Sequence, residues 1–281
     1  MKDRFLLFLM KLMPTHAISR LVGYLAEKSF SQGIIPIFAK KFDIAIEEAQ
    51  KPIHEYKSLN EFFTRKLKPG MRPMSSNTAD VVSPADGKIA AFGLINEGKL
   101  IQAKGVYYTV WDLLGISKQE GKRYEGGKFI TIYLSPRDYH RVHSPIRGKI
   151  TDFTYLPGTL FPVNAFGVRA VDGLFAKNER LITFVESKAG RVGVVKVGAT
   201  IVGSVKVVYH DHATTNVRAG QVQRSQLTEA HPIERGEEIG YFRFGSTVVL
   251  VFEKEAIEFQ SDLRVGQKVK MGETIACMQR N

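Results

Sequence analysis

The sequence predicts an α+β protein in which N-terminal amphipathic helices precede a mainly antiparallel β core. Between residues 5 and 50, apolar side chains recur with a helical period, as in the i, i+3, i+4, i+7 series that starts at Ile18. From about residue 71 to the C-terminus, short β-branched runs alternate with Gly, Pro and Asp. We therefore expect a helical segment over residues 1–70 and a β-rich domain over residues 71–281.

The composition restricts the class of protein. A chain of 281 residues with 44% hydrophobic residues can bury a core, which argues against disorder. The single cysteine, Cys277, excludes an internal disulfide framework and a cysteine-built zinc site, and it favours a reducing, intracellular setting. The net charge of +12 favours anionic partners. The sequence has no zinc-finger spacing, RNP-like strand or dense Lys/Arg run, so we expect a membrane surface and no nucleic acid.

The helical segment is expected to lie on a membrane surface. Its first residues, MKDRFLLFLMKLMPTHA, place large apolar side chains beside Lys2, Arg4 and Lys11. Lys11 interrupts the apolar patch before it is long enough for a signal peptide, and no apolar run reaches the roughly 18–20 residues of a spanning helix. Packing of the apolar helix faces onto the body of the protein is an alternative of similar weight. Further on, SLNEFF provides a capping-box helix start with Ser58 and Glu61.

Two pairs of segments indicate an internal repeat. SPADGKIAAF at Ser83 and SPIRGKITDF at Ser144 share the pattern S-P-x-x-G-K-I, and ERGEEIGYF at Glu234 is similar to KMGETIACM at Lys270. Turn-then-strand elements of this form resemble the hybrid-barrel motif of biotinyl and lipoyl carriers and of glucose-type phosphotransferase IIA domains. We therefore expect a β core that is built by duplication and has hybrid-barrel character.

Two histidines stand in an informative setting, the segment SPRDYHRVHSP. His140 and His143 are spaced i, i+3, and in an extended chain or a tight turn both imidazoles can reach one cleft. Histidine titrates near neutral pH and transfers protons in either direction, although a metal site or a buried structural pair fits the same spacing. His210, Asp211 and His212 are a weaker metal candidate, because adjacent strand residues alternate faces and no third ligand is evident. We expect no metal.

A glycine interrupts the strand pattern GEEIGYFRFGSTVVLVF just before its most apolar part. Gly245, Ser246 and Thr247 have ordinary turn composition, and the sequence after Ser246 lacks the second glycine of a hydrolase nucleophile elbow. Asp86, in SPADGKI, is likewise typical of a tight turn. Each of these residues alone is a weak indication of chemistry.

In combination, these segments resemble the phosphatidylserine decarboxylases, a pyruvoyl-dependent family made as proenzymes. The similarity runs in one order from Tyr56 to the C-terminus, through SLNEFFTRKLKPGMRP, SPADGKI, YHRVHSP, PGTLFPVN, LFAKNER, VGATIVGS and GEEIGYFRFGST. It implies a carboxy-lyase that converts phosphatidylserine to phosphatidylethanolamine. It also implies that the chain cuts itself between Gly245 and Ser246, and that Ser246 becomes a covalent pyruvoyl group, the cofactor and electron sink of the reaction.

The resemblance also assigns roles to the candidate residues. Ser246 is the nucleophile of self-cleavage, His143 is its base and Asp86 orients that base. His140 supplies the proton that replaces CO2, although the division of labour between the two histidines stays open. Three further residues are expected to contact the substrate, namely Phe161 as an apolar wall, Asn164 near the head group and Thr247 as a hydrogen-bond donor. A loop role for Asn164, in which it satisfies backbone groups, stays open as well.

The same resemblance implies partners and a location. The fragments 1–245 and 246–281 are expected to stay associated, and the enzyme is expected to bind the anionic cytoplasmic face of the cell membrane as a peripheral protein. The sequence leaves open whether it is a homodimer. Two departures stand out, because Phe244 precedes Gly-Ser-Thr where many relatives have Leu, and residues 209–226 match the family less well.

Two other functions fit parts of the sequence. A hybrid-barrel phosphotransferase or carrier-type domain would use His140 or His143 as a phosphoryl acceptor. The segments FFTRKLKPGMRP and PGTLFPVN have no counterpart in that family, which argues against it. A noncatalytic membrane-binding protein would require the whole ordered series of similarities to be coincidental.

Overall fold

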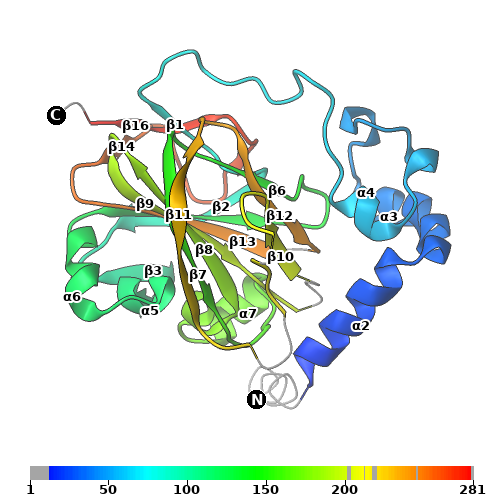
Figure 1. Ribbon diagram of the computed structural model, residues 1–281, viewed down its shortest axis with the longest axis horizontal. Helices are drawn as coiled ribbons and strands as arrows, with labels where there is room; N and C mark the ends of the chain where they lie inside the picture. Colours follow the sequence, from blue (N-terminus) through cyan, green and yellow to red (C-terminus); the bar gives the residue numbers. More distant parts are fainter. Residues whose placement is uncertain (1–12, 201–203, 212, 217–219, 245, 280–281) are drawn as a thin grey trace.

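The computed structural model describes residues 13–200, 204–211, 213–216, 220–244 and 246–279. A helical arm lies on one side of a body made mainly of strands (Figure 1). The arm consists of α2 (Thr15–Glu27), η1 (Ser29–Ile34), α3 (Ile35–Phe42), η2 (Ile46–Glu48), η3 (Ile53–Glu55) and α4 (Leu59–Phe63), where η marks a 3-10 helix. The predicted α+β class is confirmed. The division at residue 70 stays a prediction, and the apolar patch before residue 13 lies outside the described residues.

Local sequence accounts for the start of α4. Ser58 is its N-cap, and the Ser58 hydroxyl accepts a hydrogen bond from the Glu61 N–H at 3.2 Å, as the capping box predicts. The Glu61 carboxylate accepts instead from the Lys57 N–H at 2.8 Å, one residue before the N-cap. The helix ends in Phe62 and Phe63, which are both buried, so the last turn of the arm is packed into the protein.

The body contains the strands and several short helices. Its elements are β1 (Asp80–Val82), β2 (Gly87–Leu94), β3 (Lys99–Ala103), β4 (Val106–Thr109), α5 (Val110–Leu114), α6 (Lys118–Gly121), η4 (Lys122–Tyr124), β5 (Lys128–Leu134), β6 (Arg141–His143), β7 (Gly148–Leu156), α7 (Ala165–Ala170), α8 (Leu174–Lys177), β8 (Arg180–Ser187), β9 (Gly190–Val197), β10 (Ser204–Val207), β11 (Gln223–Ile233), β12 (Glu238–Arg243), β13 (Ser246–Phe252), β14 (Ile257–Phe259), β15 (Lys268–Val269) and β16 (Thr274–Met278).

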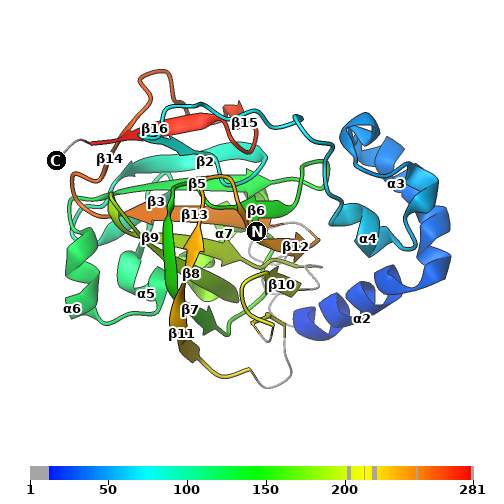
Figure 2. The same ribbon diagram turned by 45° about the horizontal axis from the view of Figure 1, so that its top comes forward.

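The paired strands of the described chain are antiparallel and form open sheets. The largest has eight strands in the order β11-β7-β8-β9-β13-β5-β2-β15, which can be followed in Figure 2. Two three-stranded sheets, β1-β16-β14 and β10-β12-β6, and the β3-β4 pair make up the rest. These strands do not close into a barrel, so the predicted hybrid-barrel character is not confirmed.

Strand β13 lies in the middle of the large sheet, between β9 and β5. Its alternating side chains enter two cores, with Val248 and Leu250 in one and Val249 and Val251 in the other. Strand β12, which precedes it in the chain, belongs to the β10-β12-β6 sheet. The single interrupted strand that the sequence pattern indicates is therefore two strands in two sheets, and the chain crosses between them just before Ser246.

The sequence repeat is also a structural repeat. Ser83 and Ser144 make the same three hydrogen bonds. In each copy the hydroxyl donates to the backbone carbonyl of the residue two positions later, and the serine N–H donates to the backbone carbonyl of a glutamate. The serine carbonyl accepts from the N–H of a glycine. The partners are Ala85, Glu273 and Gly272 in the first copy and Ile146, Glu237 and Gly236 in the second. The two copies also exchange bonds, since the His143 N–H donates to the Pro84 carbonyl and the Val82 N–H to the Pro145 carbonyl. His143 is therefore fixed at the junction of the two copies.

Candidate active site

His143 is held as a neutral base with one acceptor nitrogen. Its Nδ1 lies 2.8 Å from the Gly236 carbonyl, which can only accept, so Nδ1 carries the proton. Its Nε2 lies 3.1 Å from the Tyr139 hydroxyl and is the acceptor of that bond. Burial lowers the pKa of His143, and the bond to Gly236 opposes this shift. The ring therefore has the protonation state that a general base requires.

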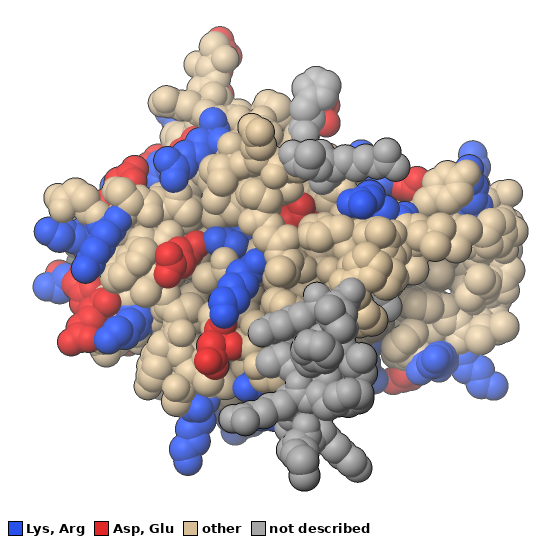
Figure 3. Space-filling view, turned by 90° about the horizontal axis from the view of Figure 1, so that it is seen from below, with Lys and Arg blue, Asp and Glu red and all other residues tan. Residues whose placement is uncertain are grey.

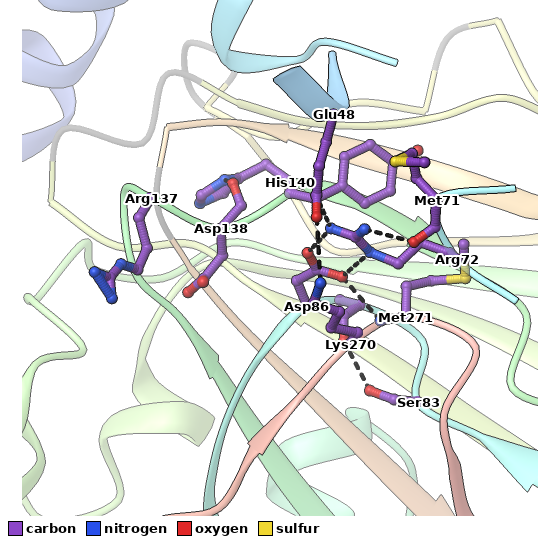
Figure 4. Close-up of polar contacts among 12 residues, drawn as sticks. Glu48, Met71, Arg72, Ser83, Asp86, Arg137, Asp138, His140, Lys270 and Met271 are labelled. Carbon is purple, nitrogen blue, oxygen red and sulfur yellow. Dashed lines mark hydrogen bonds and ion pairs between the residues drawn. The ribbon is translucent and has the colours of Figure 1, made fainter. Parts of the chain in front are cut away.

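Asp86 is fixed by one arginine and a backbone amide. Arg72 donates to both carboxylate oxygens, from Nε to Oδ1 at 2.9 Å and from Nη2 to Oδ2 at 2.5 Å. The Met271 N–H adds a third bond to Oδ1 at 2.8 Å. Figure 4 shows Arg72 between Asp86 and Glu48, and the Arg72–Glu48 bond is 2.7 Å long. Since Glu48 ends η2, this cluster also fastens the helical arm to the body.

Asp86 and His143 lie in one region without a direct hydrogen bond. His143 and the two residues that hold Asp86, Arg72 and Met271, line the same pocket of about 300 Å³. Both ring nitrogens of His143 have other partners, so the acceptor that orients its Nδ1–H is the Gly236 carbonyl. The charge of Asp86 still acts on the ring and raises its pKa slightly against the effect of burial. The catalytic roles given to Asp86 and His143 stay predictions.

His140 is completely buried and keeps one nitrogen without a partner. Its Nδ1 donates to the Asp138 carbonyl at 2.8 Å, and its Nε2 has no hydrogen bond. Burial, with a smaller contribution from Arg65, lowers its pKa to about 3. The ring packs on Phe63 with a centroid distance of 4.1 Å, and Phe63 packs on Phe244 at 4.7 Å. One aromatic ring thus connects His140 with Phe244, which precedes the glycine of the predicted cleavage point.

Phe244 has a backbone conformation that phenylalanine rarely adopts. Its φ is +74°, in the left-handed region, and its side chain is 8% exposed. A non-glycine residue held there is strained by about 1–3 kcal/mol. Packing against Phe63 holds the residue in place, so the strain lies next to the predicted scissile bond. Gly245 itself lies outside the described residues, and Ser246 begins β13 opposite Leu134.

The strain at Phe244 gives a testable expectation. Replacing Phe244 with Gly relieves it, and we expect self-cleavage to slow about 10-fold because the uncut chain becomes more stable relative to the bent transition state. Phe244→Leu keeps a Cβ and an apolar side chain, and it should cut at close to the wild-type rate. Electrophoresis of chains sampled after synthesis measures both rates. Equal rates for the two variants would contradict a role for the strain.

None of the three expected substrate contacts lines the pocket that contains His143. Thr247 shares its face of β13 with Val249 and Val251, is fully buried, and its hydroxyl has no partner. Phe161 is buried in the core cluster on that side of the sheet. Asn164 is exposed and caps α7, accepting from the Gly167 N–H at 3.0 Å. This capping bond is the loop role that the sequence left open, and the substrate roles of all three residues stay predictions.

Several residues of the site were not identified from the sequence. Arg72 and Arg65 both lie in the segment FFTRKLKPGMRP, which carries part of the family resemblance. The sequence assigns no role to either arginine side chain. Tyr139 lies within YHRVHSP, and only its burial beside His143 gives it a place in the site. The metal candidate at 210–212 includes His212, which lies outside the described residues. The described part of the chain holds no cluster of potential metal ligands.

Comparison with known proteins places this chain in a family. The family model for phosphatidylserine decarboxylase matches residues 59–277. A phosphatidylserine decarboxylase proenzyme of Brevibacillus brevis is 46% identical over 265 residues, which cover 94% of each chain. Proenzymes of the same name from Myxococcus xanthus and Shewanella sp. strain W3-18-1 are 40% and 42% identical, over 98% of this chain and 99% and 98% of theirs. The chain therefore belongs to the phosphatidylserine decarboxylase family of carboxy-lyases.

Proposed function

We propose that this chain decarboxylates phosphatidylserine to phosphatidylethanolamine with a pyruvoyl group, which forms from Ser246 by self-cleavage after Gly245. The observation that carries the proposal is the crossing from β12 to β13, where the strained Phe244 lies two residues before Ser246 and is linked through Phe63 to His140. The test is whether a purified sample contains a separate fragment 246–281 with a blocked N-terminus. A fully active chain without that fragment would contradict the proposal.

In the proposed self-cleavage, the Ser246 hydroxyl attacks the carbonyl carbon of residue 245. The hydroxyl proton passes to Nε2 of His143, the C–N bond breaks, and the nitrogen takes up a proton as an ester forms. Loss of the Ser246 α-proton expels the carboxylate of residue 245, and hydrolysis of the remaining enamine releases ammonia. The Gly236 carbonyl holds the Nδ1–H, so Nε2 of His143 keeps its lone pair for the first step. Tyr139 must give up its bond to Nε2 at that moment.

The residues around Ser246 fit a pyruvoyl group. Oγ1 of Thr247 is a buried hydroxyl without a partner that can donate to an oxygen of the group, and Nε2 of His140 is a buried acceptor without a partner that can receive a proton. When present, the group withdraws the electrons left by CO2. His140 would then hold the replacing proton at Nε2, while the bond from its Nδ1 to Asp138 fixes the orientation of the ring.

We further propose that the arm binds an anionic membrane at the cytoplasmic face of the cell membrane. Large apolar side chains on α2, η1 and α3 are exposed, and Figure 3 shows a mostly uncharged surface over this arm. The exposed side chains are Leu21, Tyr24, Leu25, Phe30, Ile34 and Ile37. An apolar patch of this kind on a chain of net charge +12 is typical of an interfacial anchor. Within the described residues, no helix is long and apolar enough to span a bilayer.

Removing two of these side chains tests the membrane proposal. Phe30 and Ile37 are 63% and 69% exposed, and each contributes about 1–2 kcal/mol if it enters the interface. We expect the double change Phe30→Ser and Ile37→Ser to weaken sedimentation with phosphatidylserine-containing vesicles at least 10-fold. Val265→Ser, at a residue of the β body that is 63% exposed, is the matched control and should bind normally. Equal loss in the control, or no loss in the double variant, would contradict docking through the arm.

A further inference from the structure

Arg65, just after α4, is a buried cation with two unused donors. Its side chain reaches toward the loop before His140, and the residue is only 4% exposed. Nη2 donates to the carbonyls of Arg137 at 3.2 Å and Asp138 at 3.5 Å. Nε and Nη1 are buried and have no partner. Two N–H-bearing atoms of a guanidinium are therefore unsatisfied inside the protein, which is costly unless an acceptor arrives.

No described carboxylate neutralises this charge. The carboxylates whose charge acts on it, Asp86 and Glu48, are both bonded to Arg72. The Phe62 ring, 5.3 Å from the Arg65 guanidinium carbon, offers no hydrogen-bond acceptor to Nε or Nη1 in its own plane. Burial accordingly lowers the pKa of Arg65, which is the effect expected of a cation without a counter-ion. Buried charges in proteins are normally paired, so the missing partner points to an anionic ligand.

Arg65 lies beside the residue expected to handle the proton of the reaction. The carbonyl of Asp138 accepts both from Nδ1 of His140 and from Nη2 of Arg65. The positive charge of Arg65 adds a small lowering of the pKa of His140 to the larger effect of burial. The adjacent residue, Lys66, lines the pocket that also contains His143. An anion held by Arg65 would therefore lie next to His140.

We propose that Arg65 binds the phosphodiester of the lipid head group through Nε and Nη1, and thereby places the head group beside His140. This inference rests on the proposed function. Phosphatidylserine offers two anions, its phosphodiester and its carboxylate. A cation on the carboxylate would stabilise the ground state and lose that interaction as CO2 departs, which opposes catalysis. The phosphodiester is unchanged by the reaction, so a cation there binds substrate, transition state and product alike.

Two small ligands separate the two anions. Glycerophosphoethanolamine carries the phosphodiester and the amine without a carboxylate, and O-methylserine carries the carboxylate and the amine without a phosphate. We expect Arg65→Met to weaken binding of glycerophosphoethanolamine by about 10-fold or more, as measured by NMR titration of the purified enzyme, and to leave O-methylserine unaffected. With phosphatidylserine in mixed micelles, KM should rise by a similar factor at nearly constant kcat.

Arg147→Met is the matched control, because it removes the same charge from an exposed side chain paired with Glu234 and should change neither affinity. Thermal unfolding tests a purely structural role for Arg65. A ligand-binding role predicts an equal or higher Tm for Arg65→Met, since an unpaired buried charge is removed. Selective loss of O-methylserine, or unchanged glycerophosphoethanolamine binding, would overturn the inference, as would a large fall in Tm. A wild-type enzyme that binds glycerophosphoethanolamine yet releases no CO2 would contradict the proposed function alone.

Discussion

We expect that replacing Ser246 with alanine leaves the chain uncut and abolishes decarboxylation. The substitution removes the hydroxyl that we propose attacks the preceding carbonyl, so neither the ester nor the pyruvoyl group could form. The hydroxyl of Thr247 is not expected to substitute, because Thr247 is fully buried and shares its face of β13 with Val249 and Val251 of the hydrophobic core. Intact-mass measurement should give one species of 31.5 kDa for the variant, and the separate fragment 246–281 for the wild type.

Ser225→Ala is a suitable control, since it removes a serine hydroxyl from β11 in the same sheet without touching the site. It should cut and decarboxylate like the wild type. A Ser246→Ala chain that still splits at this position would exclude Ser246 as the nucleophile. An uncut Ser246→Ala chain with normal activity would show that catalysis needs no pyruvoyl group.

Replacing His140 with asparagine should preserve self-cleavage and remove most of the decarboxylase activity. The Asn amide can keep the bond that Nδ1 of His140 makes to the Asp138 carbonyl, so the local fold is retained. It cannot transfer a proton from the position of Nε2, and the loss of such a group lowers rates by about 10²–10⁴-fold. Release of CO2 from phosphatidylserine, measured on fully cut enzyme, tests this expectation.

The pH dependence of unfolding provides a second readout for the same variant. Burial lowers the pKa of His140 from 6.5 to about 3, so between these values the unfolded chain binds a proton that the folded chain does not. This group therefore makes the free energy of unfolding fall as the pH drops through that range. His140→Asn should lose less stability between pH 6.5 and pH 4 than the wild type, whereas the exposed control His231→Asn should not differ from it. If His140→Asn instead abolishes cleavage, the roles of the two histidines are exchanged.

Local patterns in the sequence were sufficient for much of the fold. The cap at Ser58 depends on neighbouring residues, and the repeat around Ser83 and Ser144 carries its own turn and hydrogen bonds. The crossing before Ser246 could not be predicted in the same way. Alternation of apolar and polar residues is the same for one interrupted strand and for two strands in different sheets, so the pattern marks the interruption without showing where each half pairs.

The sequence predicts which residues lie in the site better than it predicts their hydrogen-bond partners. The histidines and Asp86 stand in short segments that the family resemblance marks, yet the partner of each is set by tertiary packing. Arg72 binds Asp86, and a carbonyl binds His143, where the triad pattern suggested a contact between those two residues. Arg65 was overlooked for a further reason. Arginine is usually exposed, and nothing in the local sequence indicates that this one is buried without a counter-ion.

The central position of β13 determines what the molecule becomes once it is cut. The fragment 246–281 supplies a strand between β9 and β5, and its later strands β15 and β16 pair with β2 and β1 of the larger fragment. Before cleavage, refolding is a property of one chain. Afterwards it is a bimolecular assembly whose yield falls with dilution, so a cut enzyme that unfolds does not readily return. The working lifetime of the cut enzyme is then set by its unfolding rate rather than by the equilibrium between folded and unfolded chains.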